Sequence, residues 1–319
     1  MPALRSDDTL GFLAALGVLE LCSNAMAEPV ELGWDGVGGT ALLAGPFSTV
    51  EAVAQCLSET AADMIRASRV LPCPDPGVVR SVDRAARAEA EEKGKLDPAH
   101  VRAEGAVQAF ERVRLAELAG DHSSARWLAA MVNQITNAPS TGGFRALTPF
   151  YSASGQMTLH QLYSDHLGAV HKDPHLLEQA LVKWERTEGQ TGANLDVRAL
   201  QDATVGGAGK PSNAAAVGAT WLALMAVPFF PQASGRRPRV RGWESPNRGK
   251  AVLRWPIWSR PLDRHAVETL LGHPTLDLPP SESHAALRAL GVDAVCRASR
   301  RELSNSSGAL QPPSVSPIR

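Results

Sequence analysis

The sequence predicts an α+β fold that is rich in helices and carries short antiparallel strands. Apolar residues recur with a helical period over much of the chain, and short apolar or alternating runs stand between glycine-rich turns. The two kinds of segment are mixed along the chain, and no internal repeat is visible. With 319 residues, of which 44% are apolar, the chain is long enough for two compact domains or one large one.

The first predicted element is a helix over residues 9–23. Asp7 or Asp8 can cap its N-terminus, and its surface is apolar nearly all round, so we expect it inside the protein. It is not expected to be a secretion signal, because the preceding segment is negatively charged and Glu20 closes the apolar run. No apolar stretch approaches the roughly 20 residues that span a bilayer. We therefore expect a cytoplasmic protein with no membrane partner.

Local signals define the next two elements. Runs at 30–34 and 41–43, separated by glycine-rich turns, predict a short hairpin. Ser48 and Glu51 form a capping box, which predicts a helix that ends near residue 67.

The rest of the chain is assigned in the same way. We expect further helices within 77–118 and at 123–136, 157–170, 174–186, 214–227, 262–271 and 282–290, and strands at 144–151 and 252–258. The predicted organisation is an N-terminal α+β domain with a helical insertion (1–150), a C-terminal α+β domain with a basic hairpin (151–303) and a disordered tail (304–319).

The cysteines indicate a reducing compartment. They stand far apart and form no CxxC pair, which argues against a structural zinc site and a disulfide framework. They are Cys22, Cys56, Cys73 and Cys296.

Residues 236–264 carry the main functional signal. This run holds nine basic and two acidic side chains, a net charge of +7, whereas the other residues hold 23 basic and 31 acidic ones. A focused positive field attracts a polyanion, because each cation near a phosphate releases counterions. The alternative is a solvated basic hairpin whose tryptophans lie in the core.

We expect most basic residues of this run to neutralise phosphate, Trp243 or Trp255 to stack on a base, and Asn247 to bond a base edge or the backbone. Trp243 lies in a turn flanked by glycine and proline, so its ring is the one expected to be exposed. The predicted phosphate-contacting residues are Arg236, Arg237, Arg239, Arg241, Arg248, Lys250 and Arg254.

A glycine-rich loop at 206–210 adds Lys210 to the candidate nucleic-acid contacts. Glycine amides and a lysine can cradle phosphate. The loop is not a nucleotide-hydrolysing phosphate loop, because Pro211 follows the lysine and Thr204 stands where the first glycine should be. A plain loop remains the alternative.

Histidines cluster at His160, His166, His171 and His175. The last two have the i, i+4 spacing of metal ligands on a helix, but Pro174 disfavours helix at the residue before it. We expect exposed histidines at helix ends and no metal or other cofactor. No nucleophile signature is present, so we expect no enzymatic activity. The enzymatic alternative is a small metal-dependent hydrolase that uses His166, His171 and His175.

Four segments together resemble proteins encoded with type I CRISPR systems. They are DDTLGFLAALGVLEL with the LGWDG turn after it, TPFYSASGQMTLHQL, NAAAVGATWLALMAVPFFP, and LRWPIWSRPLDRHAVETLL. The resemblance is to subtype I-G (formerly I-U) families related to the large subunit of the Cascade surveillance complex.

This resemblance implies a non-catalytic subunit that binds CRISPR guide RNA or target DNA beside other Cascade subunits. Large subunits of this kind check the protospacer-adjacent motif, hold displaced DNA and dock a helicase-nuclease supplied in trans. The chain is short for a complete large subunit, which leaves room for an accessory or split subunit. The alternative outside this class is a protein-interaction scaffold that binds an acidic partner.

Overall fold

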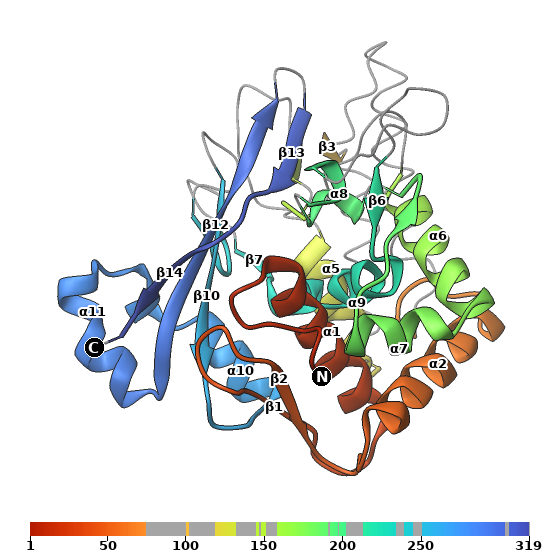
Figure 1. Ribbon diagram of the computed structural model, residues 1–319, viewed down its shortest axis with the longest axis horizontal. Coiled ribbons are helices and arrows are strands. Elements are labelled where there is room, and N and C mark those ends of the chain that lie inside the picture. Colours follow the sequence, from red (N-terminus) through yellow and green to blue (C-terminus); the bar gives the residue numbers. More distant parts are fainter. Residues whose placement is uncertain are drawn as a thin grey trace.

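The computed structural model has the expected α+β class, with helices packed beside antiparallel sheets (Figure 1). The helices and other elements expected within 77–118 lie almost wholly outside the described residues. The structure describes residues 1–74, 100–101, 119–131, 145–146, 148–150, 158–190, 192–196, 198–201, 213–233, 239–244, 251–303 and 306–318.

Most predicted helices are present, with ends shifted by a few residues. Short 3-10 turns lie at Gly192–Asn194, Val227–Phe229 and Pro274–Asp277. The α-helices are α1 (Thr9–Ala25), α2 (Val50–Arg66), α5 (His122–Met131), α6 (Leu159–Lys172), α7 (His175–Val182), α8 (Arg198–Gln201), α9 (Val217–Met225), α10 (Arg264–Leu271) and α11 (Pro280–Ala289).

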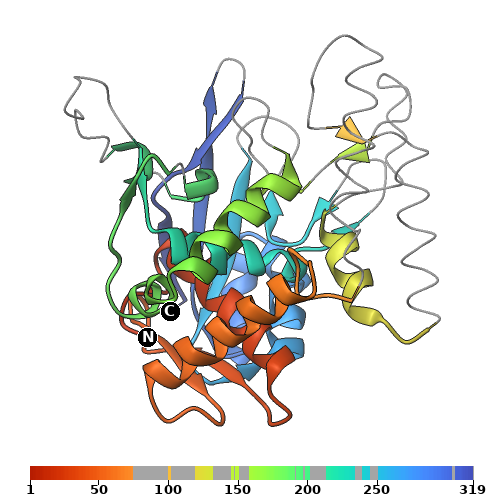
Figure 2. The ribbon, with the colours of Figure 1, turned by 90° about the vertical axis from the view of Figure 1, so that its right-hand side faces the viewer.

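Helix α1 is the buried centre of the fold. The Asp8 side chain caps it by accepting from the Gly11 N–H at 2.8 Å, and every residue from 9 to 22 is buried, as the apolar pattern predicts. A Cβ at Gly17 would lie 1.8 Å from the Leu222 carbonyl oxygen, so glycine lets α1 and α9 pack backbone to backbone. Helices α2, α6 and α7 cover this pair on the side away from the main sheet (Figures 1 and 2).

The main sheet has the strand order β13-β12-β10-β9-β8-β7, and β14 also pairs with β12. Its longest strand, β12, pairs with β10 so that Cys296 lies opposite Trp255. The strands are β7 (Gln232–Ala233), β8 (Arg239–Val240), β9 (Trp243–Glu244), β10 (Val252–Trp258), β12 (Val292–Leu303), β13 (Ser306–Leu310) and β14 (Ser314–Pro317).

A second sheet joins the two halves of the chain. The predicted hairpin of β1 (Glu31–Trp34) and β2 (Ala41–Ala44) is present, and β11 (Leu262–Asp263) pairs with the other edge of β1. Two small pairs complete the strands: β3 (His100–Val101) with β4 (Arg145–Ala146), and β5 (Thr187–Glu188) with β6 (Ala214–Ala215).

The predicted domain division does not separate two cores. Helix α1 packs on α9 and β1 pairs with β11, both across residue 150, and one cluster of buried apolar residues draws on both halves. The predicted disordered tail is also wrong. Its described residues form β13 and β14, which complete the sheet along one edge of β12.

Two local differences have simple causes. Thr49 rather than Ser48 caps α2, since its hydroxyl accepts from the Ala52 N–H at 3.2 Å. Strand β12 was missed because arginines interrupt its apolar alternation, and Arg300 occupies one of its buried positions. Within the expected strand at 144–151, the described residues show only β4. No helix in the described part of the chain is long and apolar enough to cross a membrane.

Candidate nucleic-acid interface

The described part of the basic run includes β8, β9 and β10 of the main sheet. Strands β7, β8, β9 and β10 follow one another in sequence and pair antiparallel in that order. The strand ends at which Ala233 lies opposite Arg239 and Glu244 opposite Val252 are therefore at the same end of the sheet. The candidates Arg236, Arg237, Asn247, Arg248, Lys250 and Lys210 lie outside the described residues.

Arg239 lies in β8, and Arg241 lies in the tight turn that joins β8 to β9. Arg239 is exposed, whereas Arg241 is half-buried and donates from Nη1 to the Phe229 carbonyl oxygen at 3.4 Å. Burial lowers the pKa of Arg241, and the nearby Arg126 lowers it further against the opposing effect of Glu268. Arg239 is therefore the more accessible of the two cations.

Arg254 was predicted to contact phosphate, and the structure contradicts this. Its side chain is buried, and its guanidinium pairs with Glu244 at 3.2 Å and with Asp277. Arg297 shares the Glu244 carboxylate at 3.2 Å. A buried arginine that already has two carboxylate partners cannot present its charge to a phosphate.

The prediction of an exposed Trp243 ring is also wrong. The side chain is 7% exposed, and its ring meets Phe150 edge-on with ring centres 5.1 Å apart. The guanidinium of Arg300 lies over the indole, 5.6 Å from its centre. The neighbouring glycine and proline indicated a turn correctly, but the ring folds back from that turn onto the core.

Trp255 and Trp258 belong to the core as well, which excludes the predicted stacking role for Trp255. Their indole N–H groups donate to the carbonyl oxygens of Ser6 at 2.9 Å and Leu32 at 2.8 Å. Phe12 of α1 stacks on Trp255, with ring centres 5.1 Å apart. The alternative interpretation of buried tryptophans is therefore correct for all three.

Sequence reasoning missed Arg300, whose guanidinium lies over the Trp243 ring. This arginine is 5% exposed, and it donates to the carbonyl oxygens of Gly308 at 2.9 Å and Pro149 at 2.8 Å. Burial lowers its pKa to about 10. The apolar residues at alternate positions before it, from Val292 to Ala298, were the signal that could have placed Arg300 on the inner face.

A helix break separates the two histidines that have the i, i+4 spacing. Helix α6 ends at Lys172 and α7 begins at His175, so the break expected at Pro174 is present. His166 is buried rather than exposed, and its Nδ1 lies 2.8 Å from the Leu162 carbonyl oxygen. Among the described residues, no group of three or more histidine, cysteine, aspartate or glutamate side chains could hold a metal ion.

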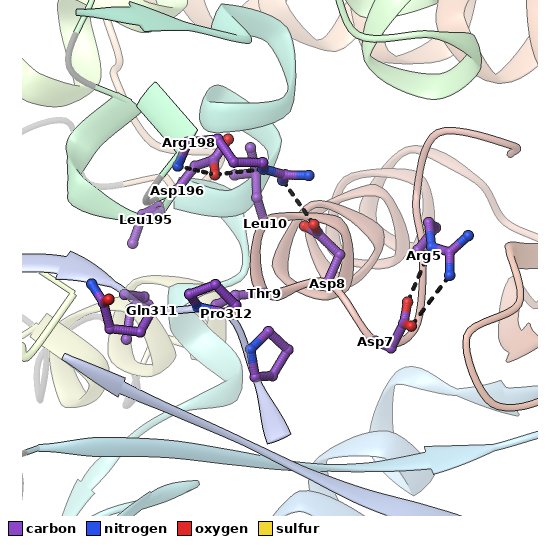
Figure 3. Close-up of a pocket in the computed structure, with 12 residues that line it drawn as sticks. Arg5, Asp7, Asp8, Thr9, Leu10, Leu195, Asp196, Arg198, Gln311 and Pro312 are labelled. Carbon is purple, nitrogen blue, oxygen red and sulfur yellow. Dashed lines mark hydrogen bonds and ion pairs between the residues drawn. The ribbon is translucent and has the colours of Figure 1, made fainter. Parts of the chain in front are cut away.

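A separate cavity of about 340 Å³ lies where the N-terminus of α1 meets residues 195–198 and 310–313 (Figure 3). Arg198 bridges Asp8 at 2.7 Å and Asp196 at 2.8 Å, and Arg5 pairs with Asp7 at 3.1 Å. Burial raises the pKa of Asp8, although Arg198 and the Gly11 N–H oppose the shift. Both arginines in the lining are paired with carboxylates, so this cavity does not suit a phosphate.

Comparison with protein-family models and with curated proteins finds no match to this chain.

Proposed function

We propose that this protein is a non-catalytic nucleic-acid-binding subunit of a CRISPR RNA-guided surveillance complex of the Cascade type. The supporting observation is the charge of the basic run, together with the sheet order that brings the strand ends at Arg239, Glu244 and Val252 to one end of the sheet. Phosphate contacts from neighbouring strands at one sheet end can follow a nucleic-acid backbone.

The structure reduces the set of residues that are proposed to contact nucleic acid. Trp243, Trp255 and Arg254 are removed, because their side chains are buried and have partners within the protein. Arg239 remains in the proposed contact set, and among the described members of that set its side chain is the exposed one. The remaining members of the proposed contact set are Arg236, Arg237, Arg241, Asn247, Arg248, Lys250 and Lys210.

The proposed ligands are guide RNA and target DNA. In this proposal other Cascade subunits lie beside the chain, and the nuclease activity comes from a helicase-nuclease recruited in trans. Because every nucleotide carries a phosphate and each phosphate contact releases counterions, we expect affinity to vary little with base sequence and strongly with salt.

Purification of the full chain tests the proposal. The protein should carry nucleic acid through purification at low salt, measured as excess ultraviolet absorbance that nuclease treatment removes. It should also bind a labelled single-stranded RNA or DNA, and neither cut it nor hydrolyse ATP. Failure to bind either strand at low salt, with a protein partner captured through the same arginines, would instead support the scaffold alternative.

A further inference from the structure

An arginine outside the basic run lies on the outer face of the main sheet, by which we mean the face turned away from α1. Successive residues of a strand alternate between the two faces, and directly paired residues share a face. Leu253 of β10 and its partner Ala298 of β12 are fully buried on the α1 side, where Trp255 stacks on that helix. Their neighbours Arg254 and Arg297 are also direct partners, so both belong to the outer face.

Arg254 and Arg297 share one carboxylate but differ in what they leave available. Glu244 Oε1 lies 3.2 Å from Nη1 of Arg254 and 3.2 Å from Nε of Arg297. The Arg254 side chain is 7% exposed, and its second Nη group pairs with Asp277. The Arg297 side chain is 39% exposed, and neither of its Nη groups donates a hydrogen bond to any residue that the structure describes. Arg297 therefore keeps hydrogen-bond donors for a ligand.

Arg239 of the basic run lies on the same face. Val240, the next residue of β8, pairs with Trp243, which pairs with Leu253 on the α1 side. Arg239 therefore points to the outer face, as Arg297 does. In the order β8-β9-β10-β12 the strands that hold the two arginines are three strand spacings apart, or about 14 Å.

The strands between these two arginines bring small or neutralised side chains to the outer face. Val252 of β10 and Ser299 of β12 are direct partners there, and both are half-buried. Glu244 lies opposite Val252, and its charge is shared by the two arginines that it contacts. A phosphate backbone that crosses this face would meet an exposed cation on each side.

We propose that Arg297 is a further phosphate contact, and that the nucleic-acid backbone crosses the outer face of the sheet from β8 to β12. This inference rests on the proposed function and adds the direction in which the ligand lies. Glu244 holds the Nε side of the guanidinium, so the two Nη groups are oriented before the ligand binds. Phosphate oxygens accept from two such N–H groups at once, which is the geometry that arginine offers and lysine does not.

The salt dependence with which the full chain binds a labelled single-stranded RNA tests this contact. Arg297→Gln should lower the slope of log affinity against log salt by roughly 0.7 and weaken binding roughly fivefold at 0.1 M salt. Its melting temperature should stay close to that of the wild type, because a partly exposed ion pair contributes little to stability. Arg297→Lys, which keeps the charge, should retain most of the slope.

Arg288→Gln is the matched control. Arg288 is an exposed cation in the last turn of α11, which ends just before the start of β12, at the other end of that strand from Ser299. This variant loses the same charge away from the proposed contact, so its affinity and salt slope should match those of the wild type.

The outcomes separate this inference from the proposed function. A slope that Arg239→Gln lowers and Arg297→Gln leaves unchanged would overturn the contact at Arg297 and leave the proposed function standing. Weaker binding by Arg297→Gln at an unchanged slope would also overturn it, because a purely structural defect does not alter the number of counterions released. If the wild-type protein does not bind RNA or DNA at low salt, the proposed function fails and this inference fails with it.

Discussion

The core and the outer edge of the main sheet use arginine in different ways. In the core, Arg126 donates two hydrogen bonds to the buried Glu20 carboxylate, at 2.9 and 3.1 Å, and Arg254 pairs with Glu244. At the edge, Arg239 in β8 is exposed. It belongs to the basic run at 236–264, in which cations far outnumber carboxylates. Charge alone therefore does not identify a ligand-binding arginine. Burial and the partner of each guanidinium decide whether it stabilises the fold or remains available.

Truncation of Trp243 gives the largest expected effect. Trp243→Ala should lower the free energy of unfolding by about 3–5 kcal/mol, because it empties a buried site lined by Phe150 and Arg300. Urea denaturation measures this loss. Trp243→Phe, which keeps an aromatic ring, should recover part of the stability. If Trp243→Ala instead abolished binding of single-stranded nucleic acid and left the free energy of unfolding unchanged, the ring would be exposed and not part of the core.

Removal of the buried carboxylate should cost nearly as much. Glu20→Ala leaves Arg126 partly buried without its bidentate partner, so we expect a loss of about 3 kcal/mol in the free energy of unfolding. Glu28→Ala, at an exposed position just after α1, is the matched control and should have little effect. Equal stability of the two variants would contradict the distinction between core and edge charges.

The smallest effect concerns the pH dependence of stability through His166. Burial lowers the pKa of this histidine in the folded protein, although the Leu162 carbonyl oxygen opposes the shift. Below the ordinary histidine pKa of about 6.5, His166 binds a proton in the unfolded chain but stays neutral in the folded one. The contribution is therefore fully present above about pH 6.5 and is lost as the pH falls toward the folded pKa.

The difference in unfolding free energy between wild type and His166→Gln isolates this contribution. We expect the wild type to lose stability relative to the variant as the pH falls from 7.5 to 5. A difference that stays constant over this range would show that His166 is not held in its neutral form.

Sequence patterns predicted the elements whose signals are local. The Asp8 cap and the apolar surface of α1, the β1–β2 hairpin and β10 are all present. The patterns failed where tertiary contacts decide. Arg300 breaks the alternation of β12 because it bonds carbonyls that only the folded chain brings near, and Trp243 points to the core because Phe150 lies there.

Tertiary contacts also decide which residues of the candidate site are available to a ligand. The sequence located the excess of positive charge, but it could not separate Arg254 from Arg239, because the separation depends on Asp277, a carboxylate more than twenty residues farther along the chain.

The most direct test of the account is the salt dependence of single-stranded RNA binding, measured by fluorescence anisotropy. The triple variant Arg236→Glu, Arg237→Glu, Arg239→Glu should bind at least about tenfold more weakly, and its salt slope should fall by roughly 0.7 for each lost phosphate contact. The matched control reverses three cations at exposed positions elsewhere, Lys172→Glu, Lys183→Glu and Arg288→Glu, and should retain most of the affinity and slope. Equal affinity and slope for the folded edge variant and the wild type would contradict the assignment of the basic edge to nucleic acid.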